Sequence, residues 1–193
     1  MRIIFIRHGR TQSNVERLLD TAFPGTPLDE VGEAQAAGLA ARLAHEPIEA
    51  VMTSDITRAR QTGEPLAAAL GVPLIVHPGV REVFAGDWEM STDWTEYEAV
   101  VFSWENDLDA SMPNGDSGIS FFERFDQAIC ELFDYDCVAV VSHGAALYAW
   151  LGGRGDLTFP EGEVWRLSNT DFVIVEGNQG AWRILSWGDR DLT

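Results

Sequence analysis

The sequence predicts a three-layer α/β/α sandwich built on a mixed, mainly parallel sheet, with antiparallel edge strands and a small lid insertion. Short β-branched runs alternate with helical segments over residues 2–153, which is the pattern of a parallel sheet covered by helices. A β-rich tail with turn signals follows, and this favours antiparallel strands at one edge. Residues 83–116 break the alternation, so we expect them to form an insertion over one end of the sheet.

The first half of the chain contains three predicted strands and two predicted helices. Residues 2–7 are β-branched and aromatic, as in a buried strand, and two further short strands are expected at 48–54 and 73–78. Apolar residues at helical spacing predict a helix after Asp29, a suitable N-cap. A second helix is expected to begin near residue 55 and to end at a glycine, as the segment 55–71 does.

The second half repeats the alternation and then changes character. An amphipathic helix is expected to begin after Ser117, and the apolar strand 137–142 follows it. The next helix, 143–153, is expected to stop at a double glycine, and residues 163–187 hold three β-rich runs that predict a meander. We find no repeat and no linker between two domains, so residues 1–193 are predicted to form a single domain.

The composition limits the classes of partner. The 193 residues carry a formal net charge of −18 at pH 7, and all 13 basic residues are arginines. We expect no nucleic-acid or membrane partner, because basic clusters dominate those affinities and no apolar run approaches the ~20 residues that span a bilayer. The N-terminus holds no signal-peptide core, and Cys130 and Cys137 are expected to be reduced core residues. These features predict a cytoplasmic protein.

Polar side chains gather at three predicted strand ends. Arg7 and His8 end the first strand, Arg58 follows the second, and His143 follows the fourth and opens a helix. Parallel sheets place ligand sites at the carboxyl ends of their strands, so we expect these side chains to meet beside a helix N-terminus. Each residue alone has an ordinary structural explanation, but together they fit a phosphoryl group, which needs several donors and positive charge. Since the histidines and cysteines have no metal-ligand spacing, we predict no metal and no cofactor.

Six segments, in order along the chain, resemble the histidine phosphatase superfamily in its phosphoglycerate-mutase-like branch. They are RHGRTQSN (7–14), PLDEVGEAQA (27–36), TSDITRARQT (53–62), REVFAGDWE (81–89), PNGDSG (113–118) and VVSHGA (140–145). Two features depart from the family pattern: Met90 replaces the usual glycine, and FPGTPL lacks the aspartate that often precedes PL. Both departures concern the recognition of substrate rather than the phosphoryl chemistry.

The resemblance implies a metal-independent phosphomonoesterase that hydrolyses a small phosphate ester through a phosphohistidine and releases inorganic phosphate. It implies that His8 is the nucleophile and that Glu82 protonates the leaving oxygen and then deprotonates water. Arg7, Arg58 and His143 would hold the phosphoryl oxygens. The resemblance and the predicted pocket add four expected contacts to phosphate or substrate, which are Thr11, Asn14, Thr21 and Gly144.

Two other functions stay open. A cofactor-dependent phosphoglycerate mutase would return the phosphoryl group to its substrate, but no basic residue lies between Glu82 and Arg124 to hold a second anionic group. A catalytically silent phosphate-binding module is the other, although all the expected catalytic residues are present. The acidic, aromatic segment 83–116 favours monophosphates with a neutral, apolar or cationic remainder. The sequence leaves open the natural substrate, whether these aromatic residues contact it, and whether the chain forms a homodimer.

Overall fold

The protein is described by a computed structural model over residues 1–156, 166–178, 181–188 and 190–192. The strands are β1 (Arg2–Arg7), β2 (Ala50–Thr53), β3 (Leu74–Val76), β4 (Cys137–Ser142), β5 (Phe172–Asn178), β6 (Ala181–Trp187) and β7 (Arg190–Asp191). The helices are α1 (Gln12–Glu16), α2 (Glu30–Arg42), α3 (Thr57–Leu70), α4 (Thr95–Ser103), α5 (Gly118–Cys130) and α6 (Gly144–Arg154), with short 3₁₀ turns η1 (Pro78–Val80) and η2 (Gly86–Trp88).

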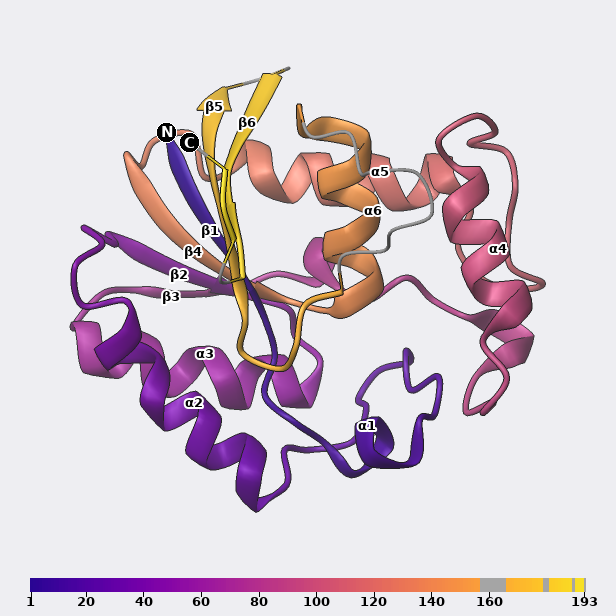
Figure 1. Ribbon diagram of the computed structural model, residues 1–193, viewed down its shortest axis with the longest axis horizontal. Coiled ribbons are helices and arrows are strands. Elements are labelled where there is room, and N and C mark those ends of the chain that lie inside the picture. Colours follow the sequence, from indigo (N-terminus) through magenta and orange to yellow (C-terminus); the bar gives the residue numbers. More distant parts are fainter. Residues whose placement is uncertain (157–165, 179–180, 189, 193) are drawn as a thin grey trace.

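The strands form one mixed sheet in the order β3-β2-β4-β1-β5-β6-β7. The pairs β2–β3, β2–β4 and β1–β4 are parallel, whereas β5, β6 and β7 are joined by antiparallel pairings at the other edge. Helices α2 and α3 cover one face of the sheet, and α5 and α6 cover the other (Figure 1). The predicted α/β/α sandwich with antiparallel edge strands is therefore confirmed.

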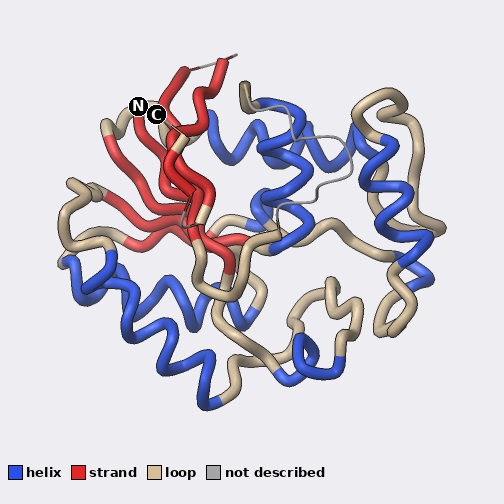
Figure 2. Tube along the Cα trace, in the orientation of Figure 1, coloured by secondary structure: helices blue, strands red, loops and turns tan. Residues whose placement is uncertain are grey.

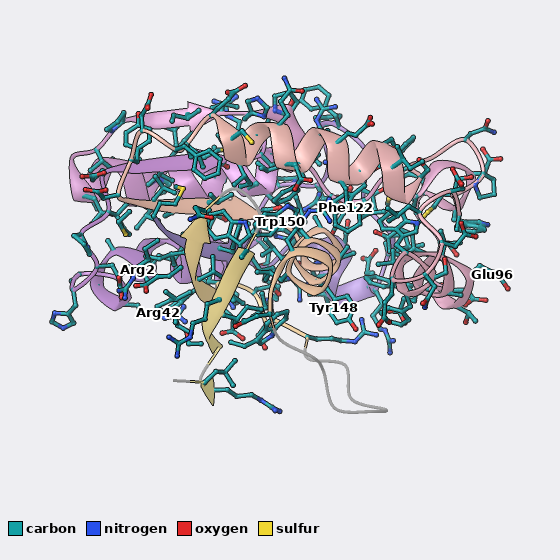
Figure 3. The ribbon with its side chains drawn as sticks, turned by 90° about the horizontal axis from the view of Figure 1, so that it is seen from above. Arg2, Arg42, Glu96, Phe122, Tyr148 and Trp150 are labelled. Atoms are coloured by element: carbon teal, nitrogen blue, oxygen red, sulfur yellow. The ribbon has the colours of Figure 1, made fainter. Side chains whose placement is uncertain are left out.

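The alternation of side chains along β1 explains why both faces need helices. Ile3 and Phe5 join the core beneath α5 and α6, while Ile4 and Ile6 join the core beneath α2 and α3. All four are fully buried. On the α5–α6 side, Trp150 lies between α6 and the sheet (Figure 3), with its ring 5.0 Å from that of Phe5. A strand that is apolar on both faces can only be stable at the centre of such a three-layer fold.

Side-chain caps set the starts of helices α2 and α5. The Asp29 side chain accepts the Gly32 N–H at the start of α2, and Ser117 forms a capping box at the start of α5, as the sequence predicts. The helix expected near residue 55 begins at Thr57, because Ile56 is extended. The helix expected to stop at the double glycine continues to Arg154.

Three expectations about other parts of the chain have different outcomes. The first β-rich run of the expected meander, 163–167, lies mostly outside the described residues, and its last two residues are not in a strand. Both cysteines are free thiols, but only Cys137 is in the core; Cys130 ends α5 and is exposed, so its expected burial is wrong. None of the helices in the described ranges has the length and apolar content that a membrane crossing requires.

The segment 83–116 contains η2 and α4, and the rest of it is largely loop (Figure 2). Helix α4 lies on the side of α6 away from the sheet (Figure 1). Tyr97 and Trp104 are buried in the same core as α5 and α6, and the Trp104 ring stacks on Phe121 at 5.5 Å. Part of the aromatic content of this segment therefore packs internally.

Candidate active site

The register of the central strands brings two histidines together. β1 and β4 pair in parallel so that Arg7 lies opposite Ser142, and each strand is followed by a histidine. The rings of His8 and His143 are 5.2 Å apart, and both side chains are buried, with exposed fractions of 3% and 0%. The carboxyl ends of β1 and β4 are therefore adjacent, as the sequence predicts.

The hydrogen bonds of His8 define its tautomer. Nδ1 lies 2.7 Å from the Gly9 carbonyl oxygen, which can only accept, so Nδ1 carries the proton. Nε2 accepts a hydrogen bond from Arg58 Nε at 3.0 Å, and a guanidinium can only donate, so Nε2 carries a lone pair. Burial, assisted by the charges of Arg58 and Arg7, holds the pKa of His8 well below its usual value. The result is a neutral imidazole with its free electron pair on Nε2.

Arg58 is held from the opposite side by the loop that follows α1. Its Nη2 donates to the Asp20 carbonyl oxygen at 2.7 Å, and its Nη1 lies 3.5 Å from Asp20 Oδ2. Burial would raise the pKa of Asp20, but hydrogen bonds from Thr26 and the charge of Arg58 lower it overall. Gly25 has a φ of +71°, and a Cβ there would lie 2.5 Å from Arg58 Nη1. The loop can approach the guanidinium this closely only with glycine at that position.

Arg7 provides a second, partly buried cation. Its Nη1 donates to the Leu167 carbonyl oxygen at 2.5 Å, which fixes the guanidinium against the chain that enters β5. Burial lowers the pKa of Arg7, and the charge of Glu82 opposes that shift. Gly144, the first residue of α6, faces this group, because a Cβ added there would lie 3.5 Å from Arg7 Nε.

Four buried nitrogen atoms around His8 have no hydrogen-bond partner in the described part of the chain. They are Arg7 Nε, Arg58 Nη1, and Nδ1 and Nε2 of His143. An unpaired buried donor costs about 1–3 kcal/mol, so a fold gathers several of them in one place only where a ligand satisfies them. Two of the three side chains are cationic, which points to an anion with several oxygen atoms.

Glu82 lines the same pocket, and its side chain lies against the N-terminal end of α6. Its Oε1 accepts the Ala146 N–H at 2.7 Å and its Oε2 accepts the Ala145 N–H at 3.2 Å. The Glu82 carbonyl oxygen is held by Arg124 Nη2 at 2.8 Å. The helix dipole also favours a negative group at this place. The two hydrogen bonds from α6 fix the orientation of the Glu82 side chain.

The four further predicted contacts do not all reach the pocket. Asn14 lines it, and its Oδ1 accepts hydrogen bonds from Thr11 N and Asn169 Nδ2, so the Asn14 amide NH₂ is left for the pocket. Thr21 also lines it, but its hydroxyl donates to Glu89 Oε2 and accepts from an amide N–H. Thr11 is fully buried, caps α1 and is absent from the pocket wall.

One pocket therefore contains seven of the nine predicted residues. Its wall includes Arg7, His8, Asn14, Thr21, Arg58, Glu82 and Gly144. His143 and Thr11 are absent from the wall, although the His143 ring is 5.2 Å from that of His8. Sequence reasoning missed the residues that hold these groups, because Asp20, Glu89 and Asn169 act through contacts distant in sequence.

The rest of the pocket lining is mostly apolar and aromatic. It is made of Leu18, Leu19, Trp94, Tyr97, Val101, Phe102, Ala145, Tyr148, Leu167 and Trp187. One ion pair, between Glu98 of α4 and Arg166, lies in this wall. Within the described ranges, no group of three or more His, Cys, Asp or Glu side chains could hold a metal ion.

The chain is similar to known proteins in both sequence and fold. The family profile of the histidine phosphatase superfamily (branch 1) matches residues 3–190. The chain is 33% identical to the adenosylcobalamin/alpha-ribazole phosphatase of Salmonella typhimurium, over 94% of this chain and 88% of that protein. It is 29% identical to the probable phosphoglycerate mutase GpmB of Escherichia fergusonii, over 97% and 90%. The structure of mycobacterial glucosyl-3-phosphoglycerate phosphatase with VO3 has the same fold, with a TM-score of 0.81, 24% identity and coverage of 98% and 99%.

Proposed function

Because this chain belongs to the histidine phosphatase superfamily (branch 1) and is a phosphomonoesterase of that family, we propose that its nucleophile is His8 and that the phosphoryl group is carried on His8 Nε2. One observation carries the proposal. The lone pair of a neutral, buried imidazole lies among four buried nitrogen atoms that accept or donate no hydrogen bond within the described ranges. The imidazole can attack phosphorus, while the surrounding N–H donors stabilise the negative charge on the phosphoryl oxygens.

In the first step, the Nε2 lone pair forms a bond to phosphorus and the bond from phosphorus to the ester oxygen breaks. Arg58 Nε donates to Nε2 in the structure, so its hydrogen bond must pass to a phosphoryl oxygen as the ester binds. Arg7 and Asn14 supply further donors from the pocket wall, and His143, whose ring is 5.2 Å from that of His8, supplies one more. Charge neutralisation at the equatorial oxygens is the main requirement of phosphoryl transfer.

Glu82 handles the proton in both steps. Its carboxyl group gives a proton to the leaving oxygen, so that an alcohol departs. The carboxylate then takes a proton from water, the water oxygen bonds to phosphorus, and the bond from phosphorus to Nε2 breaks. Inorganic phosphate leaves and His8 returns to its neutral form. The fixed position of Glu82 at the start of α6 supports this role.

A phosphoglycerate mutase is the second candidate, and two observations favour keeping it. The relative from Escherichia fergusonii carries that name, and Arg166 lies in the pocket wall although segment 83–116 has no basic residue. Arg166 is paired with Glu98, however, so it is not a free anion site. The apolar wall supports an ester whose alcohol part is uncharged, such as the ribazole phosphate named in the bacterial relative.

The test measures phosphate release from a panel of monoesters that includes alpha-ribazole phosphate. In parallel, formation of 2-phosphoglycerate from 3-phosphoglycerate is followed with and without 2,3-bisphosphoglycerate. We expect hydrolysis to dominate and the bisphosphate to be neither required nor activating. Isomerisation faster than hydrolysis would replace the phosphatase by the mutase.

Three broader expectations belong to the same proposal. We propose that residues 1–193 form a single domain with the segment 83–116 as a lid, and that the protein works in the cytoplasm, where its free thiols stay reduced. Light scattering on the purified protein decides between a monomer and the homodimer.

A further inference from the structure

The charged groups in the pocket wall fall into two sets. Arg7, Arg58, Asp20 and Glu82 belong to the phosphoryl end. The remaining charged side chains among the described wall residues are Glu98 and Arg166, and the mechanism above uses neither.

Glu98 and Arg166 form an ion pair across the pocket wall. Arg166 Nη2 donates to Glu98 Oε1 at 2.8 Å, and the two residues are 68 positions apart in sequence. Glu98 comes from α4 in the segment 83–116, while Arg166 precedes Leu167, whose carbonyl oxygen holds Arg7 Nη1. The pair therefore joins the lid segment to the chain that positions a clamp arginine.

The charge of Arg166 acts on the pocket. Burial lowers the pKa of Arg7, and the charge of Arg166 adds to that shift; burial raises the pKa of Tyr148, and the charge of Arg166 opposes that rise. Both of these side chains line the same pocket. Its side chain is 59% exposed, whereas that of Glu98 is 27% exposed. A cation at this place attracts any negative group on the alcohol part of a substrate unless a neighbouring carboxylate neutralises it.

Glu98 is singled out among the acidic residues of its segment. Residues 83–116 contain nine acidic side chains, all of them described, and Glu98 alone lines this pocket. The other wall residues away from the phosphoryl end are apolar or aromatic. Among the described residues of the wall, removing the charge of Glu98 would thus leave Arg166 as the one unneutralised charge near the alcohol part.

We propose that Glu98 determines the charge preference of the enzyme: by pairing with Arg166, it makes the pocket select phosphate monoesters with an uncharged alcohol part and reject a second anionic group. The proposal rests on the phosphatase function above and refines the substrate class of the same site. Selectivity of this kind comes from placing a repulsive charge against the wrong substrate.

The experiment compares kcat/KM for three esters of different charge. Phenyl phosphate has a neutral alcohol part, 3-phosphoglycerate an anionic one and phosphocholine a cationic one. Glu98→Gln keeps the shape and a hydrogen-bond acceptor but removes the charge. We expect it to raise the ratio for 3-phosphoglycerate over phenyl phosphate by about 3- to 10-fold, because a partly exposed charge is screened by water.

Two further variants sharpen the test. Arg166→Gln leaves Glu98 unpaired, so the same ratio should fall, and the ratio for phosphocholine over phenyl phosphate should rise by about 3- to 10-fold. The double variant should return both ratios near the wild-type values, because the two charges act on each other. Glu96→Gln is the matched control: Glu96 is exposed on the outer side of the same helix (Figure 3), and its removal changes the net charge equally.

The outcomes separate this proposal from the function on which it rests. If wild type hydrolyses phenyl phosphate but Glu98→Gln leaves the ratio unchanged, or Glu96→Gln changes it equally, the proposal is wrong and the phosphatase function stands. If wild type hydrolyses none of the three esters or the monoester panel, the proposed function fails first. Should Glu98→Gln not fold, the opposite shifts in Arg166→Gln decide, and their absence overturns the proposal. A purely structural ion pair would alter thermal stability without altering either ratio.

Discussion

The two walls of the pocket differ in how far their charges are removed from water. At the phosphoryl end, the charged Arg58 side chain is 3% exposed, and the neutral His8 and His143 beside it are 3% and 0% exposed. In the rest of the lining, the charged Arg166 side chain is 59% exposed and Phe102 is also exposed. Charges in a dry site act at full strength on the reacting atoms, whereas charges at a wet rim are screened. The buried wall therefore sets the chemistry, and the rim adjusts which ester is preferred.

The two walls also differ in what holds them. The buried wall consists of strand ends and helix starts, fixed by the backbone register of β1 and β4 and by the loop that carries Asp20. We call Glu98, Phe102 and Arg166 the rim of the pocket. Its residues come from one short helix, α4, and from the chain segment before β5. A site on paired strands is more rigid than a site on loops, so substitutions should cost far more on the buried wall. Three predictions test this difference in order of expected effect.

Removing Arg58 gives the largest expected effect. Arg58→Ala should lower kcat by about 10²- to 10³-fold, because it deletes a buried, oriented donor to the phosphoryl oxygens. Arg60→Ala on the same helix is the control, since Arg60 forms an exposed pair with Glu64 and should leave kcat near wild type. The measurement is phosphate release at saturating ester. Equal effects from the two variants would remove the distinction between the walls.

Glu82→Gln should have an effect that depends on the leaving group. Esters of ordinary alcohols need a proton on the departing oxygen, so their kcat/KM should fall by about 10²-fold or more. p-Nitrophenyl phosphate should fall much less, because its phenolate leaves without protonation. A plot of the loss against leaving-group pKa provides the measurement. Equal slowing of all esters would show that Glu82 is not the acid.

The buried histidines should also make stability depend on pH. Burial and the charge of Arg58 hold the pKa of both His8 and His143 well below the usual value, so both stay neutral in the folded protein. In the unfolded chain each takes a proton below about pH 6.5. The unfolded state then binds more protons, and the free energy of unfolding falls as the pH decreases below that value, by up to about 2.7 kcal/mol per pH unit.

Denaturant unfolding at pH 7.5, 6.5 and 5.5 measures this slope. His143→Gln should show about half of the histidine contribution, since one of the two groups is removed. A free energy of unfolding that stays constant or rises as the pH falls from 6.5 to 5.5 would mean that the buried histidines are protonated in the folded state. The proposed neutral nucleophile would then be wrong at those pH values.

The parts of the fold that the sequence predicts are those with local causes. Short-range patterns predict the buried strands β1 and β4 and the caps Asp29 and Ser117. They also predict the three strand ends that carry the candidate catalytic residues. Helix α4 was not foreseen, because it is short and buries only Tyr97 and Val101 on one side. The exposure of Cys130 was missed because it lies on the solvent side of the last turn of α5, directly after the buried Ile129.

The site also has a part that the sequence predicts and a part that it does not. His8, Arg58 and His143 could be grouped from the sequence because parallel strands end at one edge of the sheet. The contacts that support these side chains could not be predicted, since Asp20 contacts Arg58 across 38 positions and Asn169 contacts Asn14 across 155. The sequence argument concerned the range between Glu82 and Arg124, which has no basic residue, whereas Arg166 reaches the pocket from a segment distant in sequence. Chemistry that depends on strand order is readable in the sequence, whereas pairings between loops require the folded chain.

The most direct test of the central claim is to trap the phosphoenzyme during turnover. Wild-type protein is quenched with denaturant while it hydrolyses a phosphate ester, and the labelled peptide is identified by mass spectrometry, with His8→Ala treated in parallel. We expect an acid-labile, base-stable phosphoryl group on the peptide that contains His8, and neither label nor turnover in His8→Ala. Phosphate on a different residue, or full turnover by His8→Ala, would contradict the assignment of His8 as the nucleophile.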